Sequence, residues 1–162
     1  MVFGSAAPFA ASFDLSSLNG TNGFVINGID GNDLSGRSVS SAGDINGDGF
    51  DDILIGAYAA SPNGDESGES YVVFGSAAPF AASLDLSTLN GTNGFVINGI
   101  SAYDYSGYSV SSAGDINGDG FDDILIGAHY ANPNGAESGE SYVIFGRASF
   151  GRTVEILSLI HI

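Results

Sequence analysis

The chain has 162 residues, of which 43% are apolar, so it is long enough and apolar enough to form the packed core of one ordinary domain. It carries 19 Asp and Glu against three Arg and no Lys, and its formal net charge of −16 argues against binding to nucleic acid or anionic membranes. No apolar run approaches the ~20 residues of a membrane span, and the absence of cysteine excludes disulfides and thiolate metal sites.

The sequence matches itself at one dominant offset. Residues 2–72 lie over residues 73–143, a unit of 71 residues, and a third copy begins at Ile144 and soon breaks off. The unit exceeds the usual solenoid and propeller periods of ~20–50 residues, so each copy should hold one structural module plus an insertion. We treat residues 1–156 as one partial repeat domain. Residues 157–162 depart from the repeat, and we interpret them as a non-native tail, the alternative being an apolar edge strand.

In chain order, four apolar segments of the repeating unit have the length of β-strands. They cover approximately residues 37–42, 52–58, 70–75 and 95–100. Clusters of Gly, Asn, Asp, Pro and Ser separate them, and the Asn-Gly pairs among these are the strongest short-range turn signal. A helical pattern is absent except for a single turn at DLSSL, residues 14–18. The sequence therefore predicts an almost wholly β fold.

The strand DILIGA does not alternate apolar with polar residues, so we expect both of its faces to be covered. A repeating four-stranded antiparallel unit with such a strand is typical of a β-propeller blade, and a solenoid or a sandwich of two related halves is the alternative. A closed ring takes ~4–8 blades. We therefore predict an all-β fold, an incomplete propeller fragment with two blade repeats. The long segment that begins SAAPF, at Ser5 and again at Ser76, is interpreted as the insertion.

One acidic loop occurs twice without change in the sequence AGDINGDGFDDILIGA, beginning at Ala42 and at Ala113. Alternate side chains of such a loop converge, because glycine at its sixth position permits a sharp turn. All donors are oxygen atoms, which select calcium or magnesium over zinc or copper, and a flexible loop suits Ca²⁺ better. The candidate ligands are Asp44, Asn46, Asp48, the carbonyl of Phe50, and Asp52, then Asp115, Asn117, Asp119, the carbonyl of Phe121, and Asp123.

Other interpretations of the acidic loop are weaker. An EF-hand needs a bidentate Glu at position 12, where this chain has Ile55 and Ile126. Asp, Asn and Gly are also good turn formers in a solvated hairpin, but two copies with the same ligand spacing favour a structural calcium ion. Asp51 and Asp122, at position 8, are expected to point away from the ion by strand alternation.

The segments ILIGA (residues 53–57) and YVVFG (residues 71–75), together with the acidic loop, resemble the FG-GAP repeat of integrin alpha-chain propellers and their bacterial relatives. The resemblance covers the chain through about Glu155 and implies a propeller whose strand-flanked loops bind calcium through the same ligand set. The chain departs from the integrin pattern in its long insertion and in having only two full copies.

Most differences between the two copies fall in the connections near residues 30–37 and 58–69. In an antiparallel meander these connections share the end of the sheet opposite the calcium loops, and loops at one end of a scaffold often carry recognition residues. Tyrosine offers large contact area at little entropic cost, so an aromatic surface for a protein or carbohydrate is one interpretation; packing between blades is the other. The tyrosines in question are Tyr103, Tyr105, Tyr108 and Tyr130.

No catalytic arrangement can be built around His129, the only histidine within the repeats. We therefore expect a non-enzymatic, calcium-binding module of a larger secreted or cell-surface protein, which acts in adhesion or ligand recognition and packs against neighbouring blades. The alternatives are the propeller of a polysaccharide-active enzyme and a structural spacer. Two blades leave apolar faces uncovered, so the chain is expected to self-associate or to be marginally stable.

Overall fold

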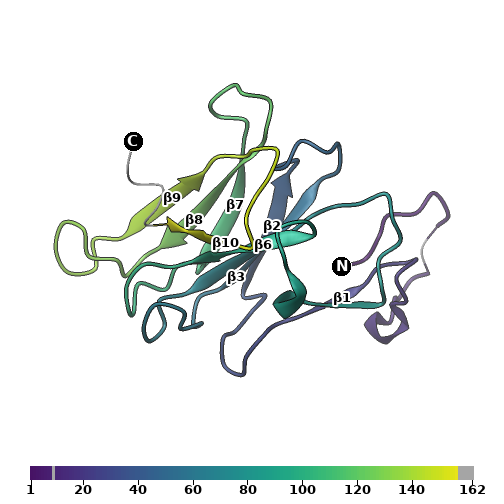
Figure 1. The fold of residues 1–162 in the computed structure, drawn as a ribbon. Coiled ribbons are helices and arrows are strands. Elements are labelled where there is room, and N and C mark those ends of the chain that lie inside the picture. The colour runs from purple at the N-terminus through teal and green to yellow at the C-terminus, as the bar shows by residue number, and fades with distance from the viewer. Residues whose placement is uncertain (9, 157–162) are drawn as a thin grey trace.

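A computed structural model describes residues 1–8 and 10–156, so the interpretation of residues 157–162 as a tail lies outside the described residues. The strands form three sheets (Figure 1). Helical structure among the described residues is limited to two single 3-10 turns, η1 (Leu15–Ser17) and η2 (Leu86–Thr88). The prediction of an all-β fold with one helical turn at DLSSL is confirmed, and the turn recurs in the second copy.

The largest sheet contains the predicted four-stranded antiparallel unit, which we call the first blade. Its strands are β2 (Ser38–Gly43), β3 (Asp52–Ala57), β4 (Glu69–Val73) and β6 (Gly94–Asn98), side by side in chain order. Each neighbouring pair is antiparallel. Leu54 and Ile55 of β3 point to opposite faces and are both buried, as expected for the non-alternating DILIGA sequence.

The second blade has three strands, where the repeat had predicted four. They are β7 (Ser109–Gly114), β8 (Asp123–Ala128) and β9 (Glu140–Ile144), paired antiparallel in chain order. The fourth strand of the first blade has the sequence GFVIN, and this sequence has no counterpart after β9 among the described residues. β9 therefore forms the edge of its sheet.

The SAAPF insertion contributes a strand to the preceding unit. β5 (Ser83–Asp85) pairs in parallel with β1 (Val25–Asn27), and β10 (Thr153–Glu155) pairs in parallel with β6. β1 and β6 share one sequence and both close a unit, so the same contact is formed twice. We call this contact the clasp: the segment after the third strand of one unit reaches back to the fourth strand of the unit before it.

Stacked phenylalanines reinforce each clasp. Phe80 stacks on Phe24 with ring centroids 4.4 Å apart, and Phe150 stacks on Phe95 at 4.1 Å, both with nearly parallel planes. An offset-stacked aromatic pair adds about 0.5–1.5 kcal/mol beyond the burial of its area. The insertion that begins at Ser76 and the shorter segment after β9 therefore join neighbouring units, whereas the copy that begins at Ser5 forms no strand among its described residues.

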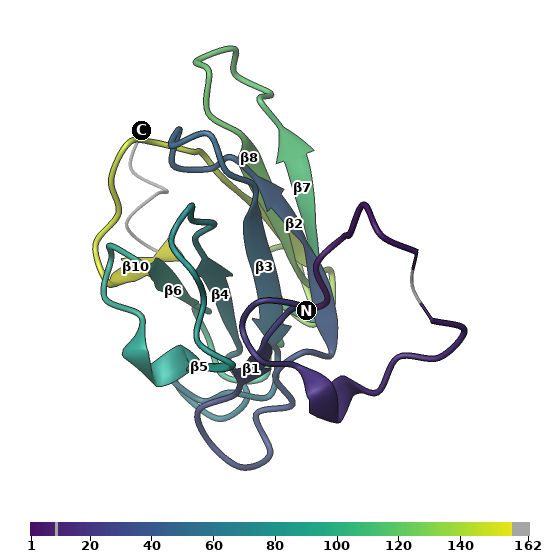
Figure 2. The ribbon, with the colours of Figure 1, turned by 90° about the vertical axis from the view of Figure 1, so that its right-hand side faces the viewer.

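The two blades pack face to face, and their first strands β2 and β7 lie side by side (Figure 2). Leu54 and Val72 of the first blade share one buried cluster with Ile124 and Ile126 of the second. The N–H of Val110 also donates to Ser38 Oγ at 2.9 Å across this contact. Adjacent blades with their first strands closest together confirm the predicted fragment of a propeller.

Truncation of the clasp should destabilise the chain. Phe95 is fully buried and stacked on Phe150, so we expect Phe95→Ala to lower the free energy of unfolding by about 3–5 kcal/mol, measured by urea denaturation. Leu15→Ala, at a side chain that is 65% exposed, is the control and should change it by less than about 0.5 kcal/mol. Equal effects of the two variants would contradict a structural role for the clasp.

Candidate functional site

Each acidic loop connects the first and second strands of its blade. β2 and β3 shift register between Ser41 and Gly43, and β7 and β8 shift at the equivalent place, so both loops begin at an irregularity in the ladder. Gly49, at the sixth position, has φ of 90°, and Gly120 has φ of 91°. A side chain is disfavoured at these angles, which explains glycine at the point where the loop turns back.

The first loop brings three predicted ligands together around its own backbone. Asp44 Oδ1 and Asn46 Oδ1 each accept the N–H of Asp48 at 2.9 Å, so these two oxygens converge on one point. Asp44 Oδ2 accepts the N–H of Gly49 at 2.9 Å, and Asn46 Nδ2 donates to Asp48 Oδ2 at 3.0 Å. Hydrogen bonds therefore link positions 1, 3 and 5, two of them through the backbone N–H of Asp48.

The second loop repeats this arrangement. Asp115 Oδ1 accepts the N–H groups of Gly118 and Asp119, and its Oδ2 accepts that of Gly120 at 2.9 Å. Asn117 Nδ2 donates to Asp119 Oδ2 at 2.8 Å. These backbone donors, the N–H of Gly120 above all, hold the pKa of Asp115 below its usual value. The loop thus favours an ionised carboxylate at position 1.

Position 9 differs from positions 1, 3 and 5. Asp52 is buried, and its two oxygens accept the N–H of Gly75 at 2.8 Å and the N–H of Ile45 at 3.1 Å. Asp123 is buried in the same way and accepts the equivalent pair of backbone bonds. Burial raises the pKa of Asp52 to about 7, and the two backbone bonds oppose this rise. Both carboxylates therefore fasten the loop to the end of the third strand.

For Phe50 and Phe121 the sequence predicts carbonyl ligands. In the structure, the N–H groups of these residues donate to Asp48 and Asp119, respectively. Within the described part of the chain, no group of three or more His, Cys, Asp or Glu side chains is arranged to hold a metal ion. The donor chemistry nevertheless fits a hard cation, because positions 1, 3 and 5 of each loop supply only carboxylate and amide oxygens.

Asp122 has a role that its sequence position did not reveal. Its Oδ2 accepts the N–H of Asp44 at 2.8 Å, so it joins the loop of the second blade to the loop of the first. A Cβ at Gly43 would lie 2.1 Å from this carboxylate, and one at Gly47 would lie 2.5 Å from the ring of Phe121. The two glycines leave room for the neighbouring blade. Asp122 points away from its own loop, as strand alternation predicts, and the unchanged Asp at position 8 of both copies was the available signal.

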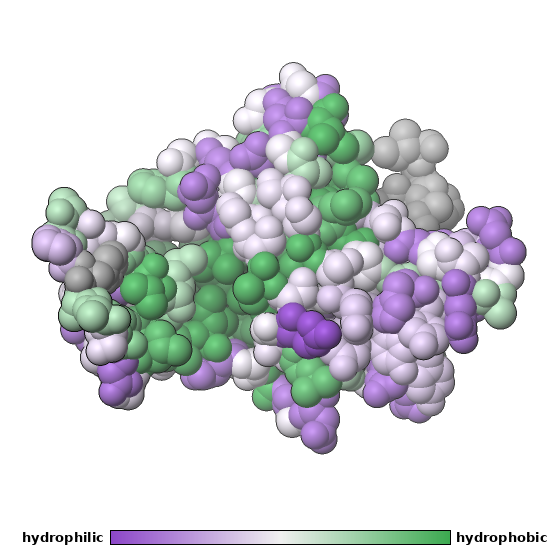
Figure 3. Space-filling model, turned by 180° about the vertical axis from the view of Figure 1, so that it is seen from behind, coloured by the Kyte–Doolittle hydropathy of each residue, from purple (hydrophilic) through white to green (hydrophobic). Residues whose placement is uncertain are grey.

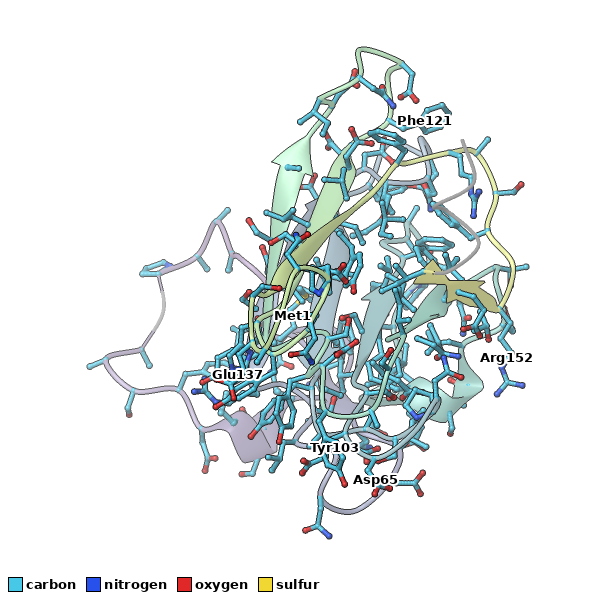
Figure 4. All side chains as sticks on the ribbon, turned by 90° about the vertical axis from the view of Figure 1, so that its left-hand side faces the viewer. Met1, Asp65, Tyr103, Phe121, Glu137 and Arg152 are labelled. Atoms are coloured by element: carbon cyan, nitrogen blue, oxygen red, sulfur yellow. The ribbon has the colours of Figure 1, made fainter. Side chains whose placement is uncertain are left out.

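An aromatic cluster lies at the opposite end of the blades. Figure 4 shows Phe121 at one end of the molecule and Tyr103 beside Asp65 at the other. Neighbouring rings in the cluster have centroids between 4.2 and 5.9 Å apart. Its members are Tyr58, Tyr105, Tyr108, His129 and Tyr130.

Two acidic side chains of the first blade accept hydrogen bonds from Tyr105 of the aromatic cluster and from the nearby Tyr103. Tyr103 donates its hydroxyl to Asp65 at 2.9 Å, and Tyr105 donates to Glu66 at 2.8 Å. These hydrogen bonds raise the pKa of both phenols, because ionisation would set two negative charges side by side. The guanidinium of Arg37 lies 5.3 Å from the centre of the Tyr108 ring, so the aromatic faces already accept one cation.

The structure brings all four predicted tyrosines to one end and adds Tyr58 and His129 to them. Tyr103, Tyr108 and Tyr130 are each more than a third exposed, although the cluster bridges the two blades. The rings therefore pack between the blades, as one interpretation expects, and also leave an exposed aromatic surface, while binding of a protein or carbohydrate stays a prediction. No helix in the described residues has the length and hydrophobicity needed to cross a membrane.

Comparison with known proteins identifies the repeat. A family model described as FG-GAP repeat matches residues 35–73 and 106–144, which contain the three strands common to both blades and both acidic loops. The chain is therefore an FG-GAP repeat protein.

Its relatives include integrin alpha chains from several animals. Integrin alpha-5 of Xenopus laevis is 32% identical over 138 residues, which is 80% of this chain and 12% of that protein. Integrin alpha-IIb of Mus musculus is 31% identical over 118 residues, 70% of this chain and 10% of the relative. Integrin alpha-PS2 of Drosophila melanogaster is 30% identical over 128 residues, which is 79% of this chain and 9% of that protein. The chain thus spans about a tenth of the length of these relatives, and all three come from animals and not from bacteria.

The buried carboxylate at position 9 should stabilise the fold even without a cation. In calcium-free buffer, Asp52→Ala leaves two backbone N–H groups without their acceptor, so we expect the free energy of unfolding to fall by about 1–3 kcal/mol. Asp48→Ala makes the same substitution at an exposed position of the loop and should change it by less than about 0.5 kcal/mol. Chemical denaturation in the presence of a chelator measures both, and equal losses would contradict this division of roles.

Proposed function

We propose that this chain is a calcium-stabilised FG-GAP propeller module of a larger secreted or cell-surface protein, and that it acts in adhesion or ligand recognition. The similarity to integrin alpha chains supports this role. The observation that carries it is the division of the molecule into two ends: acidic loops of constant sequence at one, and the aromatic cluster, where the copies differ, at the other.

Each acidic loop would hold one Ca²⁺. In the first loop the ligands would be Asp44, Asn46, Asp48, the carbonyl of Phe50, and Asp52. The second loop would use Asp115, Asn117, Asp119, the carbonyl of Phe121, and Asp123. Oxygen donors from a flexible loop match the preferences of calcium. A bound cation would supply the positive charge that the chain itself lacks, since it has only three basic side chains.

Calcium should therefore stabilise the protein. We expect titration calorimetry to detect binding with a dissociation constant of about 10⁻⁴–10⁻³ M, and saturating calcium to raise the melting temperature. An ion present at 100 times its dissociation constant contributes about 2.7 kcal/mol per site. The double variant Asp44→Ala with Asp115→Ala should lose both effects.

The matched control is Asp51→Asn, which removes one negative charge from the same loop at a position outside the ligand set. It should keep calcium binding at the second loop unchanged and at the first loop nearly so. Absence of a heat of binding, together with a melting curve that neither calcium nor chelator changes, would refute the calcium sites.

The aromatic cluster is the proposed recognition surface, for a protein or carbohydrate. Tyrosine rings stack on sugar faces and on apolar side chains, and three rings of the cluster end are exposed here. Arg37 on Tyr108 and the acidic partners of Tyr103 and Tyr105 add polar groups around the apolar centre. This combination is typical of binding surfaces that use aromatic anchors.

A glycan array probed with the labelled chain tests the carbohydrate form of this proposal. Binding should fall at least tenfold in the double variant Tyr108→Ala with Tyr130→Ala, a loss of about 1.4 kcal/mol or more. Ile116→Ala, an exposed apolar residue in the second acidic loop at the other end, is the control and should bind like wild type. Binding that survives loss of both tyrosines would exclude the cluster, and turnover of a bound glycan would favour the polysaccharide-active alternative.

A further inference from the structure

The two acidic loops have one sequence but different surroundings among the described residues. The first loop, residues 44–52, lies against the second blade, and its Ile45 is fully buried. In the second loop, residues 115–123, the equivalent Ile116 is 56% exposed. The loop between β7 and β8 stands out at the top of Figure 1, and the same tip in Figure 3 shows hydrophobic residues next to hydrophilic ones. The two loops therefore form a matched pair in which only the first contacts a following blade.

The backbone at the start of the first loop is fixed from two sides. Asp44 donates its N–H to Asp122 Oδ2 at 2.8 Å, and Asp122 donates its own N–H to the carbonyl of Asp44 at 3.2 Å. The carbonyl of Ile45 accepts the N–H of Arg147 at 2.9 Å, and the N–H of Ile45 donates to Asp52. All four main-chain polar groups of Asp44 and Ile45 are thus hydrogen-bonded, three of them to Asp122 and Arg147.

The second loop has only one of these four hydrogen bonds within residues 1–8 and 10–156. Ile116 donates its N–H to Asp123 at 3.0 Å, as Ile45 does to Asp52. The N–H and the carbonyl of Asp115 and the carbonyl of Ile116 have no partner in that part of the chain. The start of the second loop is therefore held by its own blade alone.

The carboxylate at position 1 differs between the loops in its internal hydrogen bonds. Asp44 accepts the N–H groups of positions 5 and 6. Asp115 accepts these two and also the N–H of Gly118 at 2.7 Å. In the first loop, the ring of Phe121 lies against Gly47, the equivalent of Gly118. A cation competes with such donors for the lone pairs of the carboxylate, so the first loop has fewer internal bonds to give up.

The hydrogen bonds to the second blade determine where the carboxylate of Asp44 can point. A peptide group is planar, so fixing the two peptide groups that flank a residue fixes its Cα and the direction of its Cβ. Asp122 bonds one atom of each of these two groups, the N–H and the carbonyl of Asp44. A ligand loop that is ordered before the ion arrives loses less conformational entropy on binding and therefore binds more tightly.

We propose that Asp122 is a positioning residue for the calcium site of the first loop, so that the blade that follows an acidic loop is part of that loop's metal site. Asp122 supplies no ligand. Its carboxylate and its N–H hold the backbone of Asp44, the residue at position 1. The proposal rests on the calcium binding proposed above and deepens it, because it predicts different affinities for two loops of identical sequence.

The positioning also links calcium to the contact between the blades. If this contact favours the binding conformation of the first loop, calcium bound there must strengthen the contact by the same factor, since coupling between two binding equilibria is reciprocal. Calcium in one blade would therefore stiffen its connection to the next blade as well as its own loop.

A calcium titration of the 162-residue chain followed by amide NMR measures the two loops separately in one sample. The N–H of Gly49 donates to Asp44 and the N–H of Gly120 donates to Asp115, so each amide reports calcium at its own loop. The dissociation constant from Gly49 should be about three- to tenfold lower than that from Gly120. No shift at either amide would refute the calcium sites themselves, whereas shifts at both with equal constants would overturn only the role of Asp122.

Variants of Asp122 separate positioning from charge. Asparagine keeps an oxygen that can accept the N–H of Asp44, whereas alanine does not. Asp122→Asn and Asp51→Asn each remove one negative charge near the first loop and should weaken its calcium binding slightly and equally. Asp122→Ala should weaken it about three- to tenfold beyond Asp122→Asn, measured at Gly49, with a smaller change at Gly120. A loss in Asp122→Asn as large as that in Asp122→Ala would show that charge acts and would overturn the positioning role.

A pair of glycines gives a matched test from the side of the first loop. Gly43 and Gly114 each precede position 1 and have φ of 66° and 65°, so alanine causes the same backbone strain at both. A Cβ at Gly43 would lie 2.1 Å from the carboxylate of Asp122, whereas one at Gly114 would meet nothing within 4 Å. Gly43→Ala should therefore weaken calcium binding by the first loop at least about threefold more than Gly114→Ala weakens binding by the second. Equal losses would contradict the proposal.

Discussion

The contact between successive units is the constraint on which this structure depends. A single four-stranded sheet of this sequence buries its central strand on both faces, so it needs a neighbour on each side. The chain meets this need with facing apolar surfaces, a carboxylate of one loop on the backbone of the next, and a clasp that returns to the previous unit. Folding within a unit and packing between units therefore stabilise each other, as in other repeat proteins.

This constraint also separates the two ends of the molecule. At the end with the acidic loops, glycine at two positions lets the neighbouring blade approach closely, so the residues there serve both the loop and the contact between blades. At the other end the connections only need to link one strand to the next, and tyrosines from both units meet there. One end is therefore restricted by packing, while the other is free to carry side chains that recognise a partner.

The sequence predicted most of what is local and little of what joins distant segments. Apolar runs between turn residues located β2, β3, β4 and β6, and the alternating acidic pattern located the convergence of Asp44 with Asn46. The clasp was missed because β1, β5 and β10 have three residues each and the paired strands lie more than fifty positions apart, as Val25 and Ser83 do. Neither length nor periodicity marks such a strand.

The two remaining misses have the same origin. The burial of Asp52 depends on a hydrogen bond from Gly75 at the end of another strand, and the role of Asp122 depends on the adjacent blade, so neither can be derived from the loop alone.

A clasp that always links one unit to the one before has a further consequence for heredity. Duplication or loss of one whole unit in the gene leaves every remaining interface matched, so arrays of different length can arise in a single genetic event and still fold.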